Sequence, residues 1–197
     1  EGLIRAVVEC SKVPVIKHYK GVCHVYIHKD ADLEMAEKIL INAKTQRPGV
    51  CNAAETLLVD EALAAQSLPG LCNALIERGV KLRCDESSAA ILKNALSGEL
   101  FAKWVEPADE ADWSKEYLNL TIAVRIVKDA EAAIEHINHY GSGHSECIVT
   151  RSEAAANKFL QGVDSAAVYW NASTRFTDGG EYGMGAEIGI STDKIGA

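Results

Sequence analysis

Cys51 stands in the stretch QRPGVCNAAE, residues 46–55, one residue beyond a proline and a glycine. Pro48 and Gly49 end any helix that precedes them, and the residues after Cys51 are able to start a new one. Unpaired N–H groups at a helix N-terminus stabilise a thiolate, and Arg47 adds positive charge nearby. The stretch therefore suits a nucleophilic cysteine. A small buried apolar residue, the usual role of a cysteine outside disulfides, fits the spacing as well.

Cysteine usage as a whole favours reduced thiols in a cytoplasmic protein. The chain has 197 residues and scatters six cysteines along them, namely Cys10, Cys23, Cys51, Cys72, Cys84 and Cys147. No CxxC pair occurs, so the ligand knuckles of structural zinc sites are absent. The five cysteines other than Cys51 fall inside helix or strand patterns, where packing explains them.

The overall charge limits the possible partners. A formal net charge of -8, with 24% charged and 48% hydrophobic residues, fits an ordinary globular protein and argues against nucleic-acid binding. No apolar run approaches the ~20 residues needed to cross a membrane, and the opening EGLIRAVVEC does not resemble a signal peptide. Since the chain begins at Glu1 without Met, we expect it to be a piece of something longer.

Strand-like and helix-like segments alternate along the chain. The patterns predict strands at 13–16, 23–28, 56–59, 80–84, 120–127, 146–150 and 166–170. Helices are predicted at 31–45 after an Asp30 cap, 68–79 starting near Pro69, 87–96, 129–141 and 152–161. This order is typical of an α/β protein with three layers, α/β/α, around a mostly parallel twisted sheet.

Two long loops are the candidates for ligand binding, because ligands of such sheets gather in loops at the carboxyl ends of strands. They are the loop around Cys51 and the loop 171–189. The second contains GGEYGMGAEIG, which is similar to a dinucleotide fingerprint, but Ile188 stands where the third glycine belongs. No GxxxxGK[ST] loop occurs either. The sequence therefore shows no nucleotide-binding domain.

Histidines cluster near the N-terminus but predict no metal site. His18, Cys23, His24 and His28 lie close in sequence, and His24 and His28 would share one face of an extended segment. Strand alternation explains them equally well, so we expect no metal to be bound.

Four stretches carry a family resemblance: KHYKGVCHVYI, NAKTQRPGVCNAAETLLV, HINHYGSGHSECIVT and WNASTRFTDGGEYGMGAEIGIST. Together they resemble the γ-glutamyl phosphate reductases (glutamate-5-semialdehyde dehydrogenases) of the aldehyde dehydrogenase superfamily. The resemblance runs nearly the whole length of the chain. It implies the aldehyde dehydrogenase type of catalytic domain over residues 1–197. The NADPH-binding domain and a C-terminal tail of the family would lie outside this chain.

The resemblance implies a reaction as well. Family members use NADPH to reduce γ-glutamyl phosphate to glutamate 5-semialdehyde and phosphate, the second step of proline biosynthesis. The family's nucleophile falls on Cys51, which would form a thioester with the substrate. A homo-oligomer at full length and a glutamate 5-kinase, fused or associated, are the further partners that the resemblance implies.

Other site residues follow from position in the family pattern. Glu116 aligns with a superfamily glutamate that touches the nicotinamide ribose, and a solvated acid is the alternative. The substrate's far end would be anchored by the loop after the last strand, and Arg47 or Lys20 would steer the phosphoryl group. A merely structural turn with a solvated arginine is the alternative for that loop, whose residues are Asn171, Ser173, Thr174 and Arg175.

One departure from the superfamily favours a reductase. Enzymes that hydrolyse the thioester keep a glutamate base in the segment matched by VIKHYKG, where this chain has Ile16, Lys17 and His18. Two other functions stay open. A self-contained thiol hydrolase or acyltransferase would need a base such as His18 or His144 near Cys51. A non-catalytic ligand-binding or assembly module would need no reactive thiol.

Overall fold

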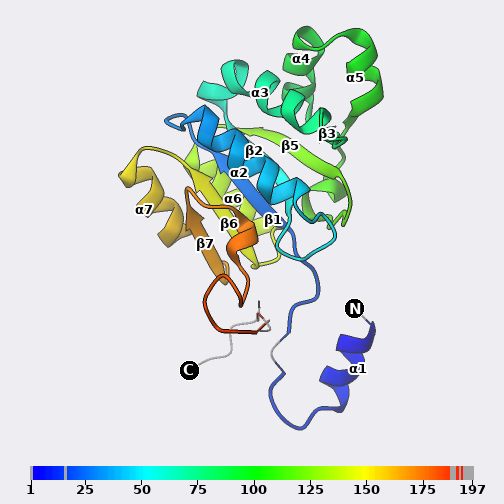
Figure 1. Ribbon diagram of the computed structural model, residues 1–197, viewed down its shortest axis with the longest axis vertical. Helices are drawn as coiled ribbons and strands as arrows, with labels where there is room; N and C mark the ends of the chain where they lie inside the picture. The colour runs from blue at the N-terminus through cyan, green and yellow to red at the C-terminus, as the bar shows by residue number, and fades with distance from the viewer. Residues whose placement is uncertain (1, 16, 187–189, 191, 193–197) are drawn as a thin grey trace.

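A parallel sheet forms the centre of the protein (Figure 1). The computed structural model describes residues 2–15, 17–186, 190 and 192. The sheet has seven strands, and all six neighbouring pairs are parallel. Across the sheet the strands are β4 (Val105–Pro107), β3 (Lys81–Cys84), β5 (Thr121–Val127), β2 (Ala54–Asp60), β1 (Cys23–Ile27), β6 (Ser145–Val149) and β7 (Ala167–Trp170). The predicted α/β class is confirmed, and among the described strands the sheet is parallel throughout.

Helices cover both faces of this sheet. Figure 1 shows the three layers, and the helices are α1 (Gly2–Cys10), α2 (Leu33–Thr45), α3 (Glu61–Ile76), α4 (Glu86–Ala95), α5 (Gly98–Trp104), α6 (Ala130–Tyr140) and α7 (Glu153–Gly162). Short 3-10 turns span Glu110–Ser114 and Thr174–Phe176. In the described part of the chain, no helix has the length and apolar character that a membrane span requires.

Successive residues of the central strands pack alternately into two hydrophobic cores, one on each face of the sheet. On β1, Val25 and Ile27 join the larger core with α2, α3 and α4, whereas Tyr26 joins the smaller core with α6 and α7. Leu57 and Leu58 of β2 divide in the same way. Because successive side chains of a strand point to opposite faces, strands buried on both faces read as continuous apolar runs. This is why the central strands were recognisable in the sequence.

Caps fix where the helices begin. The side chains of Asp60, Asp85 and Asp129 each accept a hydrogen bond from a backbone N–H in the first turn of α3, α4 and α6. Such caps satisfy N–H groups that have no partner inside the helix. The predicted cap Asp129 is confirmed, whereas α2 is capped by Asp32 and not by the predicted Asp30.

Two predicted elements are wrong in the described residues. Val13 to Val15 form no strand, and Ile16 lies outside the described residues. The helix expected to start near Pro69 begins at Glu61 and contains Pro69 in its interior. Proline is favoured in a first turn, which suggested the later start, but the Asp60 cap and the packing of α3 on the sheet outweigh that local preference.

Three elements were not anticipated. β4 adds a short edge strand that ends at Pro107, as suits an edge position, and α5 leads directly into it. α1 buries no residue and stands apart from the layered body in Figure 1.

His136 is a buried histidine on the inner face of α6. It is 6% exposed, and its ring lies 5.4 Å from that of His24 on β1. Arg125 Nη1 approaches His136 Nδ1 at 3.0 Å. Burial lowers the pKa of His136 to about 2, and the nearby charges of His24, Arg125 and His139 act in the same direction.

This histidine should make stability depend on pH. Its folded-state pKa lies below the unfolded value of about 6.5, so the unfolded chain binds one more proton between the two values. Its contribution is therefore present above about pH 6.5 and is lost as the pH falls. We expect His136→Gln to remove about 2 kcal/mol of the decrease in unfolding free energy between pH 7 and pH 5. Urea unfolding at both pH values measures this, and an unchanged decrease would mean that folded His136 is protonated.

Candidate active site

Cys51 lies in a tight turn that connects α2 to β2. The turn runs through Cys51 and Asn52, and the chain enters β2 at Ala54. The predicted helix N-terminus at Cys51 is therefore wrong. All seven residues of β2 are buried, so pairing with β1 and β5 outweighs any local tendency to restart a helix.

The backbone of Cys51 is held against the segment that precedes β1. Cys23 Sγ donates a weak hydrogen bond to the carbonyl oxygen of Cys51 at 3.2 Å. Gly21 packs so closely that a Cβ atom there would lie 1.8 Å from the same oxygen. Only glycine permits this approach, and the contact fixes the position of the Cys51 backbone from which the thiol side chain extends.

Asn52 ties the turn to the loop after β7. Its Nδ2 donates to the carbonyl oxygen of Thr177 at 2.8 Å, and Thr174 Oγ1 donates to the carbonyl oxygen of Asn52 at 2.7 Å. Arg175 Nη1 donates to Asn52 Oδ1, and Arg175 Nε donates to Gln46 Oε1 at 3.0 Å. The loop predicted to bind substrate therefore also supports the Cys51 turn.

A buried ion pair closes the base of the turn. Lys44 Nζ, in the last turn of α2, lies 2.7 Å from Glu55 Oε2 on β2, and both side chains are 0% exposed. Glu55 Oε1 also accepts a hydrogen bond from the Leu118 N–H at 3.2 Å. Burial raises the pKa of Glu55 to about 7 and lowers that of Lys44, and the partner charge opposes both shifts.

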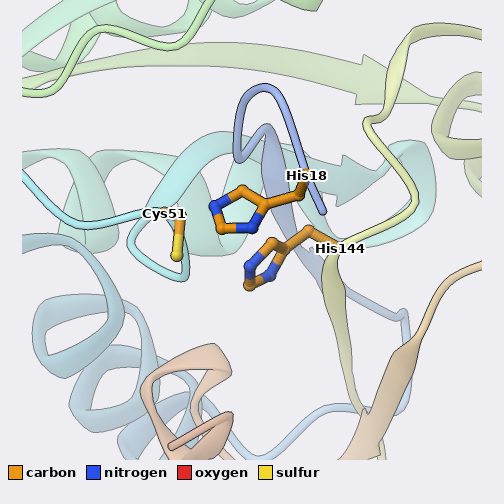
Figure 2. A group of neighbouring side chains, drawn as sticks. All are labelled: His18, Cys51 and His144. Carbon is orange, nitrogen blue, oxygen red and sulfur yellow. The ribbon is translucent and has the colours of Figure 1, made fainter. Parts of the chain in front are cut away.

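Two histidines lie beside the thiol. Figure 2 shows His18, Cys51 and His144 together, although they come from three separate segments of the chain. One ligand-type atom from each side chain lies within 4.8 Å of the other two, and the imidazole centroids are 5.1 Å apart. The thiol therefore has two imidazoles within reach, which the sequence could not establish.

His144 is buried and oriented by its neighbour. It is 1% exposed, and its Nδ1 lies 2.9 Å from Ser145 Oγ. Its Nε2 is buried without a hydrogen-bond partner among the described residues. Burial, followed by the charge of His18, lowers the pKa of His144 to about 4. The imidazole is therefore neutral near pH 7 and able to accept a proton.

These groups lie at the amino-terminal edge of the sheet. His18 precedes β1, Cys51 precedes β2 and His144 precedes β6. Since all these strands are parallel, their amino ends meet at one edge. The expectation of a site at the carboxyl ends is therefore wrong for the thiol, because the segments that enter these strands, rather than those that leave them, supply the reactive groups.

A cavity of about 680 Å³ opens over this cluster. Its walls include both predicted arginines, although the protein is acidic overall. The polar side chains around the three clustered residues are Arg47, Asn52, Arg175, Thr177, Asp178 and Tyr182. Two guanidinium groups in one cavity suit an anionic small molecule.

The other thiols are poorly placed for chemistry. Cys23 and Cys72 are buried, and burial raises the pKa of each. Burial also raises the pKa of Cys84 and of Cys147 to about 12 each. Cys10 is exposed on α1, away from the cavity, and none of the six cysteines forms a disulfide. Cys51 is the cysteine that the cavity contains.

The remaining predicted substrate residues have internal partners. Asn171, with φ of 56°, accepts from the Thr150 N–H and donates to the Thr150 carbonyl oxygen, beyond the carboxyl end of β6. Ser173 caps the 3-10 turn by accepting from the Arg175 N–H at 3.2 Å. Thr174 is fully buried on Asn52, so these three shape the loop and do not line the cavity.

Glu116 lies next to the site without lining the cavity. Its Oε1 accepts a hydrogen bond from the Gly21 N–H at 2.8 Å, close to the Cys51 carbonyl. Lys20 Nζ donates to the Ser114 carbonyl oxygen at 2.8 Å, outside the cavity. Ile188, at the third-glycine position of the fingerprint-like stretch, lies outside the described residues.

Of the histidines that the sequence groups near the N-terminus, only His18 belongs to the cluster, and its partner His144 is the other base named for the hydrolase alternative. His24 Nδ1 lies 2.8 Å from Glu146 Oε2, and His28 Nδ1 lies 3.0 Å from Thr150 Oγ1. Both histidines are therefore held by polar partners in the protein interior. One feature of the sequence pointed to the cluster: His18 and His144 each stand shortly before a strand of the same sheet.

Comparison with known structures agrees with this architecture. An acetylating aldehyde dehydrogenase from Geobacillus thermoglucosidasius is 23% identical, with a TM-score of 0.66 over 91% of this chain and 46% of that chain. No protein-family model matches the sequence. The parallel three-layer domain is thus of the aldehyde dehydrogenase type.

Proteins with higher sequence identity to this chain are γ-glutamyl phosphate reductases. The chain is 56% identical to γ-glutamyl phosphate reductase from Moorella thermoacetica over 196 residues, 100% of this chain and 44% of the relative. The crystal structure of the Thermotoga maritima γ-glutamyl phosphate reductase matches with 48% identity and a TM-score of 0.89, over 100% of this chain and 45% of that one. The chain therefore resembles γ-glutamyl phosphate reductases along its whole length, as its motifs indicated. It spans about 45% of their length.

The contact at Gly21 gives a prediction with a matched control. Gly21→Ala should lower the unfolding free energy by about 1–3 kcal/mol, because the new Cβ meets backbone atoms of Cys51 that cannot rotate away. Gly70→Ala, in the interior of α3 with nothing within 4 Å of its Cβ, should raise it by roughly 1 kcal/mol. Chemical denaturation measures both. Equal effects would show that the Cys51 turn yields easily.

Proposed function

We propose that the protein containing this chain is an NADPH-dependent γ-glutamyl phosphate reductase, the second enzyme of proline biosynthesis. Cys51 is its nucleophile, and the products are glutamate 5-semialdehyde and phosphate. The observation that carries the proposal is the thiol of Cys51 in an arginine-lined cavity, in a chain similar to such reductases over its full length. Residues 1–197 form the catalytic domain, and the other half of the enzyme supplies most of the NADPH site.

The first step transfers the acyl group to sulfur. His144, or His18 beside it, accepts the thiol proton, so that the Cys51 thiolate attacks the acyl carbon of γ-glutamyl phosphate. The bond to the phosphate oxygen breaks, phosphate leaves, and a γ-glutamyl thioester remains on Cys51. Proton transfer to an imidazole, rather than a helix N-terminus, is therefore the proposed means of forming the Cys51 thiolate.

The second step needs a hydride. NADPH, when bound, supplies it to the thioester carbon. Cys51 then leaves as thiolate, and the aldehyde is released. Glu116 uses Oε1 for the Gly21 N–H, so its Oε2 is the oxygen proposed to accept a ribose hydroxyl.

Substrate recognition falls to the two arginines of the cavity. Arg175 is proposed to bind the α-carboxylate, and Arg47, which is exposed at the rim, the phosphoryl group. Asn171, Ser173 and Thr174 act indirectly by shaping the loop that presents Arg175.

A thiol hydrolase is the second candidate, because the cluster supplies an imidazole base beside Cys51. The segment matched to the superfamily's glutamate base has no carboxylate, yet its His18 would be able to activate water. The two functions differ in turnover without cofactor: a reductase stops after one acylation, whereas a hydrolase continues.

The intact enzyme given γ-glutamyl phosphate without NADPH should therefore release about one phosphate per active site in a burst and then slow down. Mass spectrometry should find a γ-glutamyl adduct on Cys51. Cys51→Ser should abolish the burst, and Cys10→Ser, which changes an exposed thiol outside the cavity, should leave it intact. Sustained phosphate release would favour the hydrolase, and an adduct on another cysteine would disprove the mechanism.

The role of Arg175 is tested separately. Arg175→Ala should lower kcat/KM about tenfold to a hundredfold, which corresponds to a charge-assisted hydrogen bond of ~1.5–3 kcal/mol. Because Arg175 also bonds to Gln46 and Asn52, unfolding free energies must be compared in parallel. Arg151→Ala, at an exposed arginine outside the cavity, is the control. Unchanged kinetics would remove Arg175 from substrate binding.

A further inference from the structure

We propose that His18, Cys51 and His144 form a binding site for a borderline-soft divalent cation such as Zn²⁺. A cation bound there inhibits the enzyme, because it coordinates the Cys51 sulfur. The three side chains supply two imidazole nitrogens and one sulfur (Figure 2). Nitrogen and thiolate sulfur are the ligands that Zn²⁺ prefers in proteins. This site is additional to the proposed reductase chemistry and requires no substrate.

The spacing of the ligand atoms is close to that of a metal site. All three lie within 4.8 Å of one another. In a tetrahedral site with Zn–N of about 2.0–2.1 Å and Zn–S of about 2.3 Å, neighbouring ligand atoms are about 3.3–3.6 Å apart. Small rotations of the Cys51 and His18 side chains, both only partly buried, would bring the atoms to that spacing.

His144 is the fixed member of the set. It is 1% exposed, and its Nε2 is buried with no hydrogen-bond partner among the described residues. A buried imidazole nitrogen without a partner costs free energy, which a bound cation would recover. Its Nδ1 lies 2.9 Å from Ser145 Oγ. A second hydrogen-bonding group of this kind orients a histidine ligand and fixes which nitrogen faces the metal.

The cavity leaves room for a fourth ligand. The cluster opens into a space of about 680 Å³, so water is able to complete a tetrahedral set. Binding forms one sulfur–metal bond, and the thiol proton of Cys51 passes to solvent. A sulfur that donates its electron pair to the metal is no longer available to attack an acyl carbon. The cation therefore competes with acylation and leaves when a chelator removes it.

The test uses the intact protein, reduced and freed of metal, with Co²⁺ and Zn²⁺ as the probes. Co²⁺ should produce a thiolate-to-cobalt charge-transfer absorption, which Zn²⁺ should abolish by displacement. Equilibrium dialysis should show Zn²⁺ affinity at least about tenfold lower in Cys51→Ser and in His144→Asn than in the unaltered protein. Cys10→Ser and His139→Asn, at an exposed thiol and an exposed imidazole outside the cluster, should bind as the unaltered protein does.

A second measurement uses the unaltered protein alone, in case a variant fails to fold. Zn²⁺ should slow alkylation of Cys51 by iodoacetamide at least about tenfold, leave alkylation of Cys10 unchanged, and lose its effect when EDTA is added. A cobalt spectrum without sulfur charge transfer, or equal Zn²⁺ affinity in all four variants, would overturn the proposal. Since no substrate is present, these results are independent of whether the protein is a reductase.

Discussion

The Lys44–Glu55 ion pair is the interaction on which the placement of Cys51 depends. It joins the end of α2 to the start of β2 across the turn that carries the thiol, and both side chains are fully buried. Burial shifts the pKa of each partner against its charged form, so desolvation offsets much of the attraction between them. Removing either one would leave an uncompensated buried charge, which costs about 3–5 kcal/mol. The pair is therefore better explained by the geometry it fixes than by net stability.

Parallel strands turn this local geometry into a site. Because β1, β2 and β6 are neighbours with the same direction, the segments that enter them converge on one edge. His18, Cys51 and His144 each occupy such a segment, so residues 126 positions apart in sequence lie within reach of one thiol. The loop after β7 closes the arrangement through Asn52 and Arg175. Strand direction alone thus brings the thiol and the two imidazoles to one place.

The sequence predicted the parts of this structure that depend on local pattern. Apolar runs buried on both faces revealed the central strands, and the cap Asp129 marked α6. It misplaced the start of α3 and the conformation at Cys51, because sheet pairing and packing outweigh local propensity there. The motif singled out Cys51, and His18 and His144 were named as possible bases, but their position beside the thiol depends on strand order, which a single sequence does not specify. Which loop residues face inward was equally inaccessible, since Asn171 and Arg175 differ only in the partners that tertiary structure gives them.

The two imidazoles beside Cys51 fit the reductase mechanism proposed for this protein. Burial keeps His144 neutral near pH 7, as the proposed proton transfer from Cys51 requires, and the lowered pKa at the same time makes it a weaker base. The proposed cation site uses the same lone pair of His144, because an imidazole nitrogen that accepts a proton is also able to bind a metal. The arrangement proposed to activate the sulfur is therefore also the one proposed to bind a borderline-soft cation. In the two proposals taken together, substrate, proton and metal would compete for the same electron pairs, and the hydride step would follow only after Cys51 had given its pair to the acyl carbon.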